Sequence, residues 1–498
     1  MREDRINTVT EITEFGLVVL VVSGAFSAAV ALTKVAERFP IPAPALFLVV
    51  GTVGSDIFAR LEHVLSIRDV ERIGVVALIV ILFDGGMKVG WRRFRAAALP
   101  ISTLGIAGTL GTAALVAVPA HYLFDFGWTT AWIVGAALSP TDPAVMFSVL
   151  GNREIRGRAG TILEGESGAN DPVGIALMIG ILDYATHAHA SVWTIVREFC
   201  VEMSVGLAIG VAGAAVLLQL MRRITLPGQG LYPIRTLAAA GVIYGVTSVA
   251  HGSGFLAVFV AGLLVGGSRV PYKGDVERFH VSLASLGEMV VFATLGLTIH
   301  LSDLRHSNQW LDGLLLALIL VFAARPLAVG PLLLPARLRP RERIFVMWSG
   351  LRGAVPILLA AFAVLEGVDG ARRIYGIVFV VVTFSVVVQG TSIPFVAARL
   401  GVPMRTAEPL GIRRLAVAQR SRADGETIRG LPIGERSWIT RIRRDGADLP
   451  FRGTTVLRPG DEVYAITDLE DVDALRRVFE GVKAQTGRRG PEGSRPAA

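Results

Sequence analysis

The chain has 498 residues, of which 52% are hydrophobic and 18% charged, and its mean hydropathy is +0.57. This apolar fraction excludes an ordinary soluble protein of that size. The formal net charge of +8 would suit a nucleic-acid-binding protein, but the cations lie mostly between apolar runs and in the C-terminal tail. We therefore assign them to membrane orientation and expect no nucleic acid as a partner. The single cysteine, Cys200, excludes an internal disulfide and a cysteine-based metal site.

Apolar runs long enough to cross a lipid bilayer recur from near Thr13 to about Ala398. At roughly 20 residues per span, they predict an all-α polytopic membrane protein with about thirteen transmembrane helices over residues 1–400. The first run begins near Phe15, is preceded by acidic residues and has no cleavage site after it, so we expect a retained helix. Alternate loops are richer in arginine and lysine, for example 88–95, 222–223 and 337–343. The positive-inside rule places these loops and the C-terminus on the cytoplasmic side of the membrane.

The chain becomes polar and arginine-rich from about Pro403. The segments 438–443 and 462–467 predict two strands, and Asp445-Gly446 after the first is a hairpin turn. The helix expected next has an apolar face made of Val472, Leu475 and Phe479. We expect a small α+β cytoplasmic domain over 408–482 and a disordered tail over 483–498.

The fifth predicted span, AALSPTDPAVMF, contains an interruption at membrane depth. Prolines flank Thr141 and Asp142, so the backbone loses helical hydrogen bonds and carbonyl oxygens are freed. Freed carbonyls around a carboxylate are how secondary transporters coordinate small cations. The alternative for Asp142 is that its side chain only caps freed N–H groups before Pro143.

The sixth predicted span, ILEGESGANDPVGIALMIG, carries four polar residues within two turns. Helical spacing puts Ser167 on the same face as Asn170 and Asp171, with Glu166 beside them. A desolvated carboxylate such as Asp171 holds either a proton or a cation, which is the minimum requirement for exchange. The alternative for Asp171 is a cap of a half-helix before Pro172.

Further charges lie in four other spans. Arg352 in the twelfth span, SGLRGAVPILL, requires an acidic partner, and Asp84 in LFDGGM of the third span is the candidate. Arg325 in FAARPLAV has no partner that the sequence identifies. Glu288 in LASLGEMVVF either tunes the site or faces a wet dimer interface. If the chain contains two inverted six-span repeats, the fifth and twelfth spans correspond, and both are interrupted by glycine and proline.

The motifs LFDGGM, SPTDPAV, GESGANDPVGIAL, HGSGFLAVFVAGLLVG, FAARP and GLRGAV occur in this order within about residues 15–398. Together they resemble the NhaP-type branch of the monovalent cation:proton antiporter superfamily, which includes eukaryotic sodium/proton exchangers. The resemblance implies a homodimeric, elevator-type and electroneutral antiporter with two crossed broken helices. It implies Asp171 as the carrier of cation and proton. The other residues it implicates are the ligands Thr141, Ser167 and Asp142 and the supporting Asn170, Asp84 and Arg352.

The tail resembles the TrkA-C or RCK-C regulatory module over about residues 408–482. The combination resembles bacterial potassium/proton antiporters and implies exchange of potassium, or else sodium, for protons. Modules of this type dimerise and some bind a cyclic dinucleotide, whereas no GxGxxG motif predicts NAD, and we expect no cofactor. The alternative function is a cation channel gated by the module, although a carbonyl-filter sequence such as TVGYG is missing. The sequence has no HExxH, Walker A or nucleophile-elbow motif, so we do not expect an enzyme.

Overall fold

The computed structural model describes residues 42–57, 66–150, 153–155, 157–186, 191–268, 270–299, 304, 308–406, 411–433, 437–467 and 469–481, with isolated positions between 16 and 31. The chain divides into two compact units, Met1–Arg405 and Thr406–Ala498, and each is described by itself. The tail predicted to be disordered, 483–498, lies outside the described residues. So does the span expected from near Phe15, apart from those isolated positions.

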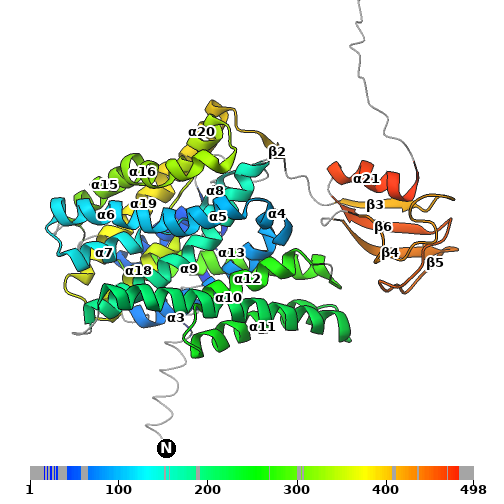
Figure 1. The fold of residues 1–498 in the computed structure, drawn as a ribbon, viewed down its shortest axis with the longest axis horizontal. Helices are drawn as coiled ribbons and strands as arrows, with labels where there is room; N and C mark the ends of the chain where they lie inside the picture. The colour runs from blue at the N-terminus through cyan, green and yellow to red at the C-terminus, as the bar shows by residue number, and fades with distance from the viewer. Residues whose placement is uncertain are drawn as a thin grey trace, which may run out of the picture. The chain divides into compact units, whose positions relative to one another are not determined.

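The first unit is a bundle of helices (Figure 1). Its α-helices up to the first interruption are α2 (Ala43–Ile57), α3 (Ile67–Val89), α4 (Trp91–Ala96), α5 (Ala98–Thr103), α6 (Thr109–Phe124) and α7 (Trp128–Ala137). They are followed by α8 (Pro143–Leu150), α9 (Arg158–Thr186), α10 (Val192–Arg223), α11 (Leu231–Val249), α12 (Gly254–Gly266) and α13 (Lys273–Leu297). The last are α15 (Gln309–Ile319), α16 (Arg325–Val329), α17 (Pro340–Trp348), α18 (Ala354–Leu365), α19 (Ala371–Phe384) and α20 (Gly390–Leu400). Short strands occur at β1 (Arg153–Ile155) and β2 (Met404–Thr406).

Three long helices contain a π-helical turn, at Leu104–Gly108, Leu320–Ala324 and Ser385–Gln389. Such turns are rare and frequently mark functional positions. Two of them lie beside the candidate site described below, because Arg325 directly follows one and Ser385 and Gln389 belong to another.

Five stretches among the described residues are long and apolar enough to cross a membrane. They are Ala98–Phe124, Val192–Arg223, Lys273–Leu297, Gln309–Val329 and Ala371–Leu400. Shorter apolar helices cover Ala43–Ser55, Gly254–Gly266 and Ala354–Leu365. The predicted multi-pass helical unit is therefore confirmed, whereas the count of about thirteen spans and the inverted repeats stay predictions.

Glycines bring α3 and α12 into backbone contact. A Cβ added at Gly86 would overlap the carbonyl oxygen of Phe259, and one added at Gly262 would overlap that of Phe83. Small residues at helix contacts are the usual means of close packing where lipid provides no hydrophobic drive. The contact fixes the turn of α3 that carries Asp84.

The second unit contains a four-stranded antiparallel sheet in the order β3-β6-β4-β5. Its elements are β3 (Gly411–Ala416), β4 (Trp438–Arg444), β5 (Ala447–Asp448), β6 (Glu462–Thr467) and α21 (Leu469–Phe479). The two predicted strands and the hairpin turn are confirmed, with positive φ at Asp445 and Gly446. The predicted apolar face of the helix is also confirmed, because Leu475 and Phe479 enter the core with Ile442 and Val463. Strand β3, which pairs with β6, was not predicted.

Candidate functional site

Two interrupted helices meet in the first unit. Helix α7 ends at Ala137 and α8 begins at Pro143, while α17 ends at Trp348 and α18 begins at Ala354. The intervening segments, 138–142 and 349–353, are not helical, so both predicted interruptions are confirmed. They touch directly, because the Asp142 backbone N–H donates to the Leu351 carbonyl over 2.8 Å.

Helix α9 contacts the first of these segments through two side chains. The Ser167 hydroxyl donates to the Thr141 carbonyl oxygen, and the Asn170 amide donates to the Thr141 hydroxyl, each over 2.6 Å. All three residues are buried. Helix and segment can approach this closely because a Cβ at Gly174 would overlap Pro140. The structure thus brings together Thr141, Ser167 and Asn170, as the sequence predicts.

The two candidate carboxylates lie at this junction. Asp171 is 6% exposed, and its Oδ1 has no hydrogen-bond partner among the described residues. The charges that act on it are those of Asp142 and Arg352. Asp142 lies against Gly353, where an added Cβ would overlap its carboxylate. Two carboxylates beside freed carbonyl oxygens form the kind of hard-oxygen site that an alkali cation or a proton can occupy.

Arg352 joins the two interrupted segments. The residue is 1% exposed, and its Nη1 donates to the carbonyl oxygens of Ser139 and Pro140, each over 2.6 Å. The predicted pairing of Arg352 with Asp84 is wrong, because Asp84 pairs with Lys88 over 2.7 Å. Carbonyl oxygens released by the interruption supply the acceptors that the prediction sought from an acid. The charges that act on Arg352 are those of Arg325, Glu166 and Asp171, and neither of the two acids forms an ion pair with it among the described residues.

Arg325 has a partner that the sequence did not identify. Its Nη2 lies 2.9 Å from Glu166 Oε1, and the two side chains are 3% and 2% exposed. Its Nε donates to the Met347 carbonyl oxygen near the end of α17 over 2.9 Å. Arg325 therefore connects α9 to the second interrupted helix.

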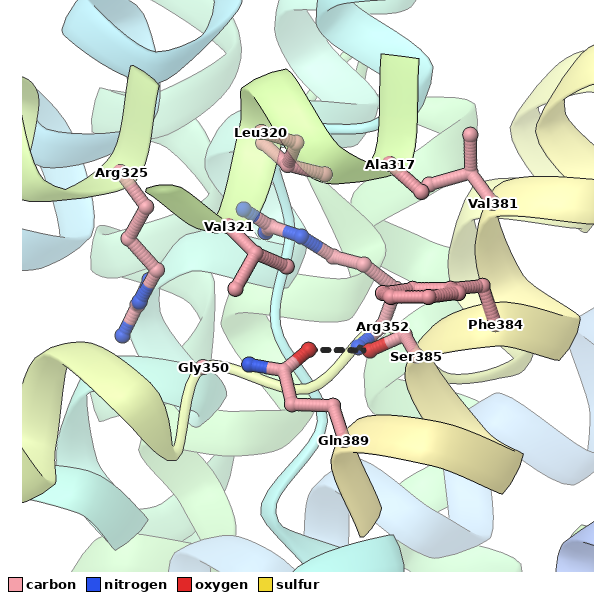
Figure 2. Close-up of a pocket in the computed structure, with 10 residues that line it drawn as sticks. All are labelled: Ala317, Leu320, Val321, Arg325, Gly350, Arg352, Val381, Phe384, Ser385 and Gln389. Carbon is pink, nitrogen blue, oxygen red and sulfur yellow. Dashed lines mark hydrogen bonds between the residues drawn. The ribbon is translucent and has the colours of Figure 1, made fainter. Parts of the chain in front are cut away.

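Ser385 and Gln389 hold the second segment and were not predicted as site residues. The Arg352 backbone N–H donates to Ser385 Oγ, which donates to Gln389 Oε1, each over 2.9 Å. The Gln389 amide donates to the Trp348 carbonyl oxygen. Figure 2 shows these residues with Arg325 and Arg352 around one pocket. A polar pair four residues apart inside the apolar run VVTFSVVVQG was the available indication.

Comparisons with known proteins show which family the chain resembles along its length. The family model described as "Sodium/hydrogen exchanger, transmembrane" matches residues 25–399, and the TrkA-C domain model matches residues 412–480. The chain is 32% identical over 480 residues to the K(+)/H(+) antiporter NhaP of Alkalimonas amylolytica, covering 93% of this chain and 83% of the relative. It is 27% identical to the Na(+)/H(+) antiporter ApNhaP of Aphanothece halophytica, covering 84% and 82%.

A solved structure shows the same fold. The sodium proton antiporter MjNhaP1 from Methanocaldococcus jannaschii superimposes with a TM-score of 0.67 at 21% sequence identity. The match covers 78% of this chain and 99% of that structure.

Proposed function

We propose, since the chain belongs to the sodium/hydrogen exchanger family and ends in a TrkA-C domain, that it exchanges a monovalent cation for protons across the bacterial inner membrane. Potassium is the favoured cation, because relatives at 32% identity are K(+)/H(+) antiporters. Sodium is the next candidate, in line with the more distant ApNhaP. The same oxygen ligands serve both ions, so the preference rests on these relatives.

The observation that carries the proposal is Asp171 beside the junction of two interrupted helices. Its carboxylate is almost fully buried and its Oδ1 is unpartnered among the described residues. A charged, empty carboxylate at this depth is unfavourable, so the group takes up a proton or a cation. Asp142, Thr141 and Ser167 would supply further oxygen atoms, and Asn170 would hold Thr141 in place.

Arg352, Arg325 and Glu166 would support the site without contacting the ion, because an arginine repels a cation. We further propose a homodimer that works by elevator-type, electroneutral exchange, with Asn170 before the carrier aspartate as in electroneutral relatives. The C-terminal unit would face the cytoplasm and regulate exchange, with a cyclic dinucleotide as a candidate ligand. Two interrupted helices clamped together by Arg352 favour a carrier over the channel alternative.

Asp171→Asn tests the carrier role. Purified protein in proteoliposomes would be titrated with sodium, potassium, rubidium and lithium against a pH-sensitive dye, with and without an imposed potential. We expect the variant to insert normally and to lose cation-driven proton movement with every ion. Asp183→Asn, about three turns further along α9, is the matched control and should retain exchange. Exchange retained by Asp171→Asn would remove Asp171 from the carrier role.

A further inference from the structure

Lys88 is paired with Asp84, one of the acids that the family resemblance implicates in supporting the site. It lies four residues after Asp84 on α3, so both side chains share a helical face, and its Nζ is 2.7 Å from Asp84 Oδ2. We propose that Lys88 is a tethered competitor of the transported cation: its ammonium occupies Asp84 and thereby sets the apparent affinity for the ion. This inference rests on the proposed exchange function.

Several acids from different helices surround this ammonium. Glu288 on α13 is partly buried, and the charges that act on it are those of Asp142, Lys88 and Asp84. Glu164 on α9 also acts on Lys88, and it lies 3.7 Å from Arg93. Glu288, which the sequence could not assign, therefore belongs to the surroundings of the candidate site. Lys88 is the cation nearest to Asp84 in the described part of the chain.

The exposure of the two partners is unequal. The Asp84 side chain is 4% exposed, whereas that of Lys88 is 55% exposed. The carboxylate is therefore enclosed by the protein, whereas more than half of the lysine side chain lies at the protein surface. The Glu166–Arg325 pair differs, because both of its side chains are at most 3% exposed. An ion pair with one member at the surface is weaker and easier to replace by another ion than a pair with both members buried.

Competition at Asp84 has a direct consequence for cation affinity. An alkali ion that reaches Asp84 and Glu288 would find the charge of these acids partly neutralised by Lys88, so the attraction between the ion and the acids would be reduced. Without the ammonium, the same acids would attract the ion more strongly. Lys88 would thus keep the affinity low, which suits a cation that is abundant on the side of the membrane where the arginine-rich segment 88–95 is predicted to lie.

Lys88→Gln tests the proposal, because it should lower the KM for the cation and leave kcat nearly unchanged. In proteoliposomes loaded with increasing potassium, we expect the KM for potassium to fall about threefold to tenfold, with kcat changed less than twofold. Lys88→Arg keeps the charge and should stay within twofold of the unmodified protein. Asp84→Asn/Lys88→Gln should return KM to the original value or above, because the carboxylate that Lys88 would leave unpaired is also gone.

Lys273→Gln is the matched control. Lys273 begins α13, and its Nζ donates to the Gly266 carbonyl oxygen and lies 3.6 Å from Glu277, so its acidic partner is Glu277 and not Asp84. Its variant should leave KM unchanged. If Lys88→Gln lowers kcat or the yield of monodisperse protein at constant KM, Lys88 is structural and the proposal is overturned.

A binding measurement separates this proposal from the proposed function. Thermal stabilisation of purified protein by rubidium chloride reports affinity even if no exchange occurs. We expect half-maximal stabilisation at a lower rubidium concentration for Lys88→Gln than for the unmodified protein or Lys88→Arg. Equal concentrations for all three would refute competition by Lys88. An unmodified protein that binds rubidium but moves no protons would refute exchange alone.

Discussion

Glu166→Gln should strongly destabilise the membrane unit, because it leaves the Arg325 guanidinium buried without its counter-charge. The paired side chains are 2% and 3% exposed, so water cannot replace the lost carboxylate. Breaking a buried pair on one side costs about 3–5 kcal/mol. An unfolding entropy of about 2.1 cal/mol/K per residue over Met1–Arg405 converts this cost into a fall of about 4–6 °C in the unfolding midpoint.

Thermal unfolding of detergent-solubilised protein, followed by the loss of the monodisperse size-exclusion peak, measures this shift. Asp312→Asn is the matched control: the Arg373–Asp312 pair has a similar distance of 2.8 Å, but its side chains are 39% and 20% exposed. The control should lose at most about 1 kcal/mol. Glu166→Gln/Arg325→Met removes both charges and should recover part of the loss. Equal midpoint shifts for Glu166→Gln and Asp312→Asn would refute the reasoning.

Two further predictions concern the cation site and the C-terminal unit. Gly353→Ala should raise the KM for the cation several-fold in proteoliposomes, because its Cβ displaces the Asp142 carboxylate, whereas Gly245→Ala, whose Cβ meets nothing within 4 Å, should not. An unchanged KM for Gly353→Ala would place Asp142 outside the site. In the C-terminal unit, burial alone would raise the pKa of Asp461, but hydrogen bonds and charge from Arg444 and Arg458 hold it below its ordinary value of 3.8. The ionised group therefore stabilises the unit above that value, and the stabilisation is lost as the pH falls through the lower folded pKa. Asp461→Asn should reduce hydrogen-exchange protection of β6 by about 1–2 kcal/mol at pH 7 and progressively less below about pH 4, and equal protection at pH 7 would contradict this.

The position of the site was predictable because the relevant patterns are local. Prolines on both sides of Thr141 and Asp142 forbid a continuous helix whatever the rest of the chain does. Helical spacing alone puts Ser167 and Asn170 on one face, where both reach Thr141. The strands and the hairpin of the C-terminal unit follow from alternation and a turn dipeptide in the same way. Strand β3 escaped prediction because two adjacent arginines in the middle of GIRRLA interrupt the alternation of apolar and polar residues, and its pairing with β6 is long-range.

The partners of the buried arginines were not predictable because they depend on distant contacts. Glu166 and Arg325 are 159 residues apart, and no local pattern connects them. The erroneous Asp84–Arg352 pair arose from the rule that a buried arginine needs an acid. The rule left out carbonyl oxygens freed by an interruption of a helix, which are strong acceptors. Any residue type provides such a carbonyl, and here Ser139 and Pro140 do.

These contacts connect three elements, α9 and the segments 138–142 and 349–353, so that each is held to the other two. Ser167 and Asn170 join α9 to segment 138–142, and Arg352 joins that segment to 349–353. Arg325 adds the third connection, because it joins α9 to the end of α17, directly before the segment 349–353. Moving α9 and the two segments apart would break a buried ion pair and several buried hydrogen bonds at once. The binding of one monovalent ion cannot offset that cost in free energy. If the chain exchanges ions as proposed, the elements that hold Asp171 should therefore move together as one body, which is what an elevator mechanism requires.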